Sequence, residues 1–173
     1  MVQSLEMCET HVISSSKCPI YKSLEIIFSN MVVLDVSMSP LYTSTLPDII
    51  CELETLQELH CSYLSLTALP DSIGCLKNLR VLNCSYNNIT HLPHSFASLT
   101  VLQSLMLQRN CLTSLPAFHC YNLRHLHCQQ NHLTSLPRQW AVLQLLRYFS
   151  CWNSTLDNLG YLLSRWHPLL YWE

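Results

Sequence analysis

The chain has 173 residues, of which 49% are hydrophobic and only 12% are charged, and its formal net charge is −2. An average soluble domain has roughly 25% charged residues, so this surface is poor in charge and suited to contact with a partner. No run of basic residues occurs, which makes nucleic acid and anionic membranes poor partner candidates.

The N-terminal stretch has neither the basic start nor the continuous apolar core of a secretory signal. No apolar run reaches the roughly 18 residues that a membrane-spanning helix needs. We therefore expect a cytoplasmic, reducing location and no contact with membrane.

The first segment in chain order, residues 1–30, carries no repeat. Within it, Pro19 to Phe28 is expected to form a short helix, because Pro suits a first helical position and Leu24, Ile27 and Phe28 share a face. We expect residues 1–30 to cap the open end of the structure that follows.

Residues 31–155 repeat a pattern of leucines that ends each time in a Leu-Pro pair. The pairs are spaced by 23, 23, 23 and 21 residues and lie at Leu46-Pro47, Leu69-Pro70, Leu92-Pro93, Leu115-Pro116 and Leu136-Pro137. A fixed period of this size indicates stacked supersecondary units. The sequence predicts an α/β solenoid of about six repeats, with one short parallel strand of about five residues per repeat. The fourth repeat, residues 102–122, is two residues shorter than its neighbours and should be tighter on its outer side near Phe118.

Counted from the leucine that opens each repeat, such as Leu79, positions 1, 4, 6 and 11 are expected to face inward. Leucines fill most of positions 1, 4 and 11. Position 6 holds Cys61, Cys84, Cys128 and Cys151, with Leu107 between them, and these cysteines should be free thiols packed as small apolar side chains. Asn87, Asn110 and Asn131 at position 9 should bond to the backbone of the turns.

Residues 156–173 lose the repeat. Leu156, Leu159, Leu163 and Trp166 are spaced as on one face of a helix. We expect a C-terminal capping helix followed by a tail.

Positions 3, 5, 7 and 8 should point outward on the concave side, where few charges but several Tyr, Met, Arg and Trp residues fall. Those residue types are enriched in protein interfaces. The expected anchors are Tyr63, Tyr86, Met106, Arg109 and Trp152, and the expected polar contacts are Glu58, His60, Asn83, Gln108, His125, His127, Gln129 and Tyr148. The alternative is that Tyr63 and Tyr86 only cover the edge of the core.

Catalysis and metal binding are weaker hypotheses. Asn88, Cys111 and His132 share position 10 in consecutive repeats, but a thiol nucleophile needs its His between the Cys and the orienting Asn, and here the Cys lies between. His125 and His127 share a strand face, yet neighbouring strands supply no third ligand for zinc. We expect no enzymatic activity, no cofactor and no metal.

The unit L-x-x-L-x-L-x-x-N-x-L-x-x-L-P, clearest from Leu79 to Pro93, resembles a leucine-rich repeat. It is similar to the repeats of intracellular signalling scaffolds and of effectors that intracellular bacteria translocate into host cells. The resemblance implies a protein-interaction module that grips a partner with its concave face and acts as an inhibitor or adaptor by steric blocking; an effector would act in the host cytosol. The alternative is a signalling scaffold or a self-associating structural protein, with weak homo-oligomers.

Overall fold

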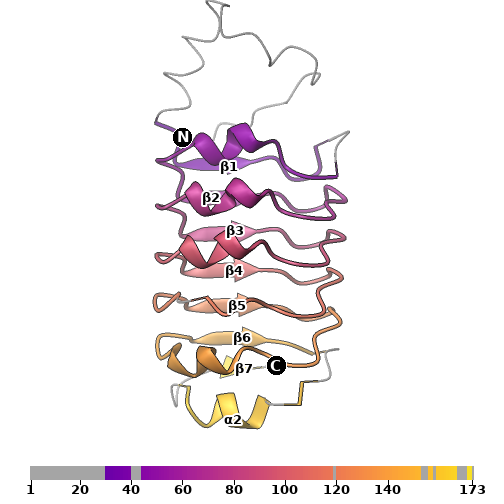
Figure 1. Ribbon diagram of the computed structural model, residues 1–173, viewed down its shortest axis with the longest axis vertical. Coiled ribbons are helices and arrows are strands. Elements are labelled where there is room, and N and C mark those ends of the chain that lie inside the picture. Colours follow the sequence, from indigo (N-terminus) through magenta and orange to yellow (C-terminus); the bar gives the residue numbers. More distant parts are fainter. Residues whose placement is uncertain are drawn as a thin grey trace, which may run out of the picture.

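A computed structural model describes residues 30–39, 44–118, 120–152, 156–157, 159–166 and 171–172. Its sheet has seven parallel strands in sequence order (Figure 1). They are β1 (Val33–Asp35), β2 (Glu58–His60), β3 (Val81–Asn83), β4 (Ser104–Met106), β5 (His125–His127), β6 (Tyr148–Ser150) and β7 (Tyr171–Trp172). The predicted solenoid is confirmed, whereas the expected N-terminal cap, apart from Asn30, lies outside the described residues.

The strand register is the one the repeat predicts. Leu59, Leu82, Leu105, Leu126 and Phe149 are paired from strand to strand and are all buried. Ser104 pairs with His125, so the two-residue shortening of repeat four leaves the sheet in register. The strands β1 to β6 are three residues long rather than the expected five, and the backbone turns sharply soon after each of β1 to β5.

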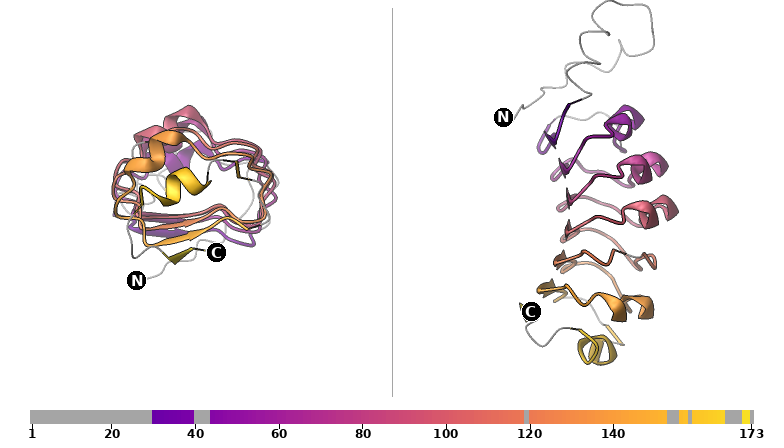
Figure 2. Two further views of the ribbon diagram at one scale, coloured as in Figure 1. Left: turned by 90° about the horizontal axis from the view of Figure 1, so that it is seen from below. Right: turned by 90° about the vertical axis from the view of Figure 1, so that its left-hand side faces the viewer.

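The convex side carries a short 3₁₀ helix in most repeats, and each follows a Leu-Pro pair. These helices are η1 (Asp48–Glu52), η2 (Asp71–Cys75), η3 (His94–Ser98) and η4 (Arg138–Val142). Seen along the stack, strands line one side of a flattened tube and these helices the other (Figure 2). No helix forms in the described part of the shorter repeat four, yet Phe118 still packs between Phe96 and Trp140, at ring distances of 5.3 and 4.7 Å. The expected tightening therefore removes a helical turn and keeps the aromatic column.

The cysteine column lies inside, as expected. Cys61, Cys84 and Cys128 are fully buried, and each thiol points at a backbone oxygen of the next repeat, with sulfur–oxygen distances of 3.3, 3.6 and 3.5 Å. Burial raises the pKa of the Cys84 thiol to about 12. These side chains are protonated, apolar fillers at neutral pH.

The asparagine column links consecutive turns. The Oδ1 atom of Asn87 accepts from the backbone N–H of Leu64 and of Leu66, both at 3.0 Å, while Nδ2 donates to the oxygens of Cys61 and Cys84. Asn110 and Asn131 make a similar link one and two units further along, with Oδ1 accepting from one backbone N–H each and Nδ2 donating to two backbone oxygens. Backbone groups that the turns bury are thereby paired.

A short helix lies at the C-terminal end, within the segment expected to form a capping helix. The helix α2 (Leu159–Leu163) buries Leu162, and Trp166 beyond it packs on Phe149 and donates its indole N–H to the Trp140 oxygen at 2.8 Å. The sequence did not predict β7, which adds a strand beside β6. Among the described residues, no helix has the length and apolar character needed to cross a bilayer.

Candidate functional site

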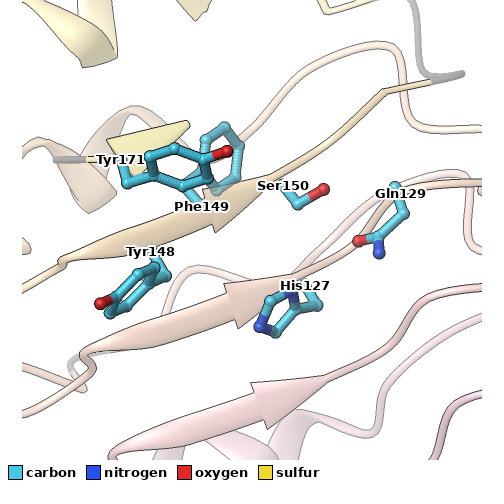
Figure 3. A pocket seen from close by; sticks show the side chains of 6 residues that line it. All are labelled: His127, Gln129, Tyr148, Phe149, Ser150 and Tyr171. Carbon is cyan, nitrogen blue, oxygen red and sulfur yellow. The ribbon is translucent and has the colours of Figure 1, made fainter. Parts of the chain in front are cut away.

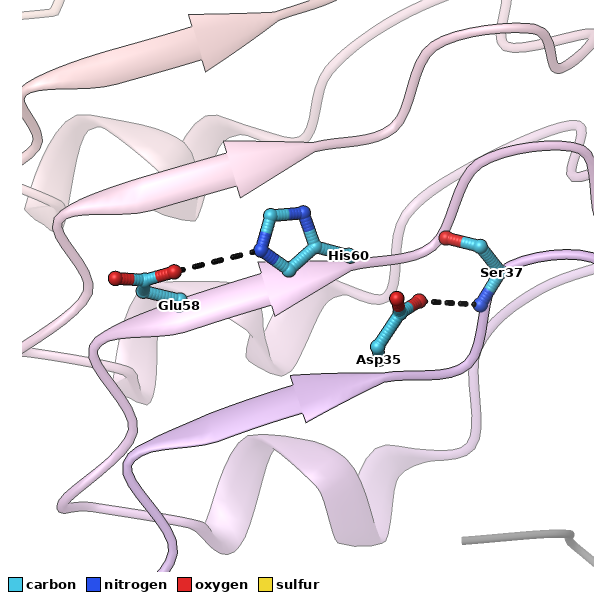
Figure 4. A network of polar contacts seen from close by, with 4 residues as sticks. All are labelled: Asp35, Ser37, Glu58 and His60. Atoms are coloured by element: carbon cyan, nitrogen blue, oxygen red, sulfur yellow. Dashed lines mark hydrogen bonds and ion pairs between the residues drawn. The ribbon is translucent and has the colours of Figure 1, made fainter. Parts of the chain in front are cut away.

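The concave face of the sheet presents the side chains of strand positions 3 and 5, because the middle residue of each strand points into the core. On β2, Glu58 and His60 lie 3.5 Å apart across this face (Figure 4). Next to them, the Asp35 carboxylate accepts from the Ser37 backbone N–H at 2.9 Å. The two carboxylates make the N-terminal end of the face acidic.

Position 8 adopts a left-handed backbone in five repeats, which the sequence did not predict. The residues are Met38, Tyr63, Tyr86, Arg109 and Gln130, with φ between 55° and 59°. Each turn is held by a hydrogen bond from the position-8 N–H to the position-7 oxygen of the next repeat, as from Tyr86 to Gln108 at 2.9 Å. Side chains at position 8 therefore stand on the rim beyond the strands.

The turn also corrects the expectation for position 7. Ser62 and Ser85 are buried rather than outward, because the backbone has already left the strand. Their hydroxyls bond to neighbours: Ser62 to the Ser37 hydroxyl at 3.0 Å, and Ser85 to the Asn83 Oδ1 atom at 2.7 Å. Trp152, at the same position in repeat six, is exposed.

Three rim residues form a continuous stack, which we call the rim stack: Tyr63, Tyr86 and Arg109. The two phenol rings lie 4.2 Å apart and nearly parallel, at 16°. The Arg109 guanidinium lies 5.1 Å from the centre of the Tyr86 ring, a cation–π contact. These three predicted anchors thus support one another across three repeats, with Tyr63 and Arg109 exposed and Tyr86 half-buried between them.

A second stack lies at position 3 near the other end of the face. The His125 ring is stacked on Tyr148 at 4.9 Å and 19°, and Tyr148 contacts Tyr171 of β7 at 6.2 Å. Desolvation, followed by the charge of Arg124, lowers the pKa of His125. This imidazole is therefore neutral at pH 7, and a pH-sensitive contact through it would need acidic conditions.

A hollow of about 240 Å³ opens beside the second stack (Figure 3). It is lined by His127, Gln129, Tyr148, Phe149, Ser150 and Tyr171. Sequence reasoning named three of these residues and missed Phe149, Ser150 and Tyr171. The omission of Tyr171 has a simple cause, since it follows a segment without repeat spacing.

The remaining predicted residues lie between the two stacks. The Oδ1 atom of Asn83 is already used within the fold, because it accepts hydrogen bonds from the N–H and the hydroxyl of Ser85. Met106 lies between Asn83 and His127 in the paired strands, and Gln108 has a buried Oε1 atom without a hydrogen-bond partner among the described residues. The structure therefore divides the predicted site into the rim stack, a polar middle and the hollow.

The position-10 residues are brought to one rim of the solenoid, where Asn88, Cys111 and His132 each donate a backbone N–H to the preceding repeat. No hydrogen bond joins the Cys111 thiol to the His132 ring in the described structure. Nor do three or more His, Cys, Asp or Glu side chains converge as metal ligands anywhere in the described ranges.

The comparisons with known proteins agree with this geometry. Residues 54–112 match the leucine rich repeat family model. The fold is a leucine-rich-repeat solenoid. No curated protein sequence matches the chain.

Solved structures of bacterial proteins share the fold. A leucine-rich repeat protein from Leptospira interrogans superposes with a TM-score of 0.76 over 83% of this chain and 37% of its own, at 29% identity. YopM from Yersinia enterocolitica gives 0.62 over 73% and 25%, at 26% identity. The functional domain of InlJ from Listeria monocytogenes, which includes a cysteine ladder, gives 0.64 over 74% and 26%, at 22% identity. This chain spans well under half the length of each of these proteins.

Proposed function

We propose that this protein binds a protein partner through its concave face and the adjoining rim. The observation that carries the proposal is the rim stack, in which exposed Tyr63 and Arg109 are held against the two faces of half-buried Tyr86. Tyr and Arg dominate the energetics of protein interfaces, and pre-ordered side chains lose little entropy on binding. Leucine-rich repeats are protein-interaction modules in general, which supports the same function.

The proposed mechanism is steric, since the bound face covers part of the partner and blocks or redirects it. We further propose that the chain is an effector of an intracellular bacterium acting in the host cytosol, a reducing location. Support comes from the bacterial origin of the three similar structures. The column of buried cysteines without disulfides is compatible with a reducing location.

The test is affinity capture from host-cell lysate with matched variants. Tyr86→Ala combined with Arg109→Ala removes most of the rim stack. Tyr161→Ala combined with Arg165→Ala removes a similar pair at the C-terminal end, formed by Tyr161 of α2 and Arg165 just beyond it, where the guanidinium lies 5.8 Å from the ring. A partner that is lost by the first variant and kept by the second supports the concave face, whereas equal retention by both would refute it.

The alternatives make different predictions in the same material. A self-associating structural protein would sediment as a larger species at high concentration. For catalysis, the test is thiol labelling: a Cys111 that reacts no faster than a model thiol at neutral pH would support a protein without thiol chemistry.

A further inference from the structure

The hollow beside the second stack brings together two buried polar oxygens that have no hydrogen-bond partner among the described residues. Ser150 is only 7% exposed, and its hydroxyl has no hydrogen-bond partner among the described residues. The Gln129 Oε1 atom is also buried and has no hydrogen-bond partner among the described residues. Buried oxygens of this kind are normally paired, because an unpaired one costs about 1–3 kcal/mol.

Figure 3 shows how these atoms are arranged. The oxygens of Ser150 and Gln129 turn toward one another at one end of the hollow, and the rings of Tyr148 and Tyr171 lie toward the other end. An occupant of matching shape would place an aromatic or apolar body against the rings and a hydrogen-bond donor between the oxygens.

The size of the hollow narrows the class of occupant. Its volume of about 240 Å³ is below the roughly 300–1,000 Å³ of small-molecule pockets and several times the roughly 30 Å³ of a water molecule. One large side chain from another protein fits this range better than a cofactor does.

The charges around the hollow narrow the class of occupant further. No carboxylate lines the hollow, and the charge of Arg124 already contributes to disfavouring protonated His125 in the adjoining stack. A lysine or arginine side chain would find no counter-ion there. A carboxylate would set its negative oxygens against the Gln129 Oε1 atom. A neutral side chain is favoured on both grounds.

We propose that this hollow is the anchor pocket for one tyrosine or tryptophan side chain of the protein partner, whose O–H or N–H donates to the Gln129 Oε1 atom beside the Ser150 hydroxyl. The inference rests on the proposed function, because it assumes that the occupant of the concave face is a protein. Tyr and Trp are the commonest anchors of protein interfaces, and both carry a single donor at the edge of an aromatic body.

The first experiment needs no partner. The full chain, labelled with ¹⁵N, is titrated with the N-acetyl amides of Trp, Tyr, Phe and Arg while its NMR spectrum is recorded. We expect the Trp and Tyr probes to shift signals of Gln129 and Ser150 with dissociation constants on the order of 1 mM. The Phe probe lacks the donor and should bind roughly 3- to 10-fold more weakly, and the Arg probe should not bind.

Two variants test the assignment. Ser150→Met should fill the hollow and abolish probe binding, and the fold should tolerate it because Met106 already occupies the equivalent position on β4. Ser104→Met, on the same face, is the matched control and should bind the Trp probe as wild type does. Gln129→Leu should remove most of the preference for Trp over Phe.

Several outcomes would overturn the proposal. They are probe binding unchanged by Ser150→Met, equal affinity for Trp and Phe, or shifts that cluster away from the hollow. If signals of the hollow move with protein concentration alone, the occupant is a second copy of the chain, and the partner assignment is wrong. A captured partner that Ser150→Met binds as tightly as wild type would leave the proposed function standing and reject only the anchor pocket.

Discussion

Replacing Asn87 with alanine should destabilise the protein more than any nearby polar substitution. Asn87 is buried and is the sole hydrogen-bond partner given by the structure for the backbone N–H groups of Leu64 and Leu66. It also donates to the Cys61 oxygen, whereas the Cys84 oxygen would keep its bond from Asn110. Asn87→Ala therefore leaves three buried backbone groups without partners.

The expected loss of stability follows from the number of backbone groups left unpaired. An unpaired buried backbone group costs about 1–3 kcal/mol, so three give an upper range of about 3–9 kcal/mol. Water entering the turn should relieve part of this cost, and we expect a loss of about 3–5 kcal/mol in the free energy of unfolding.

The assay is urea denaturation followed by tryptophan fluorescence, with Asn88→Ala as the matched control. Asn88 is the adjacent, exposed asparagine, and only its backbone N–H takes part in the turn, so its substitution should change stability by less than about 0.5 kcal/mol. Hydrogen exchange at the amides of Leu64 and Leu66 reports the same bonds directly. A loss below about 1 kcal/mol, with exchange at both amides unchanged, would refute the reasoning.

Three further predictions concern the core. Leu105→Ala should cost about 2–5 kcal/mol, because Leu105 is fully buried in the centre of the sheet; an unchanged melting temperature would show the register to be wrong. Gly74→Ala should cost about 1–3 kcal/mol of stability, since the added Cβ would overlap the backbone oxygen of Ser95 on the neighbouring helix. A melting temperature equal to that of wild type would argue against this contact. Stability should fall as pH rises above about 9, because the Cys84 pKa is about 12 in the folded protein against an ordinary value of 9.0, so only the unfolded chain loses the proton in that interval. In urea titrations at pH 8 and 10, Cys84→Ala should reduce this fall, whereas replacement of the exposed Cys75 should not.

The buried columns of side chains could be predicted because the residues of each column recur at the same position of the repeat and serve the same structural role. The inward strand leucines, the buried cysteines and Asn87 recur at fixed positions of the repeat and are buried there, with few exceptions such as Leu107 among the cysteines and Phe149 among the leucines. Repeat four is two residues shorter, but the pattern is still recognisable, and Phe118 packs between Phe96 and Trp140.

The site was predicted less completely, and the reasons are physical. A left-handed backbone is unusual for bulky residues such as Tyr86 and Arg109. The residue types at position 8 therefore gave no reason to predict a turn there. The turn is imposed by hydrogen bonds between repeats. Stacking distances depend on side-chain rotamers, which spacing does not determine. The hollow needs Tyr171, which reaches the sheet after a segment that has lost the repeat.

The dimensions of the sheet indicate what shape of partner the face accepts. The seven strands, spaced about 4.8 Å apart, span roughly 29 Å, and a three-residue strand adds only about 10 Å. The flat area is then roughly 300 Å², well below the about 800 Å² per partner of a standard interface. A stable complex must therefore also use features beyond the strands, and the structure supplies two of them, the rim stack at the N-terminal half and the hollow at the C-terminal half. A protruding partner segment that lies along the rim and inserts one aromatic side chain would use both, whereas a flat partner surface would reach neither fully.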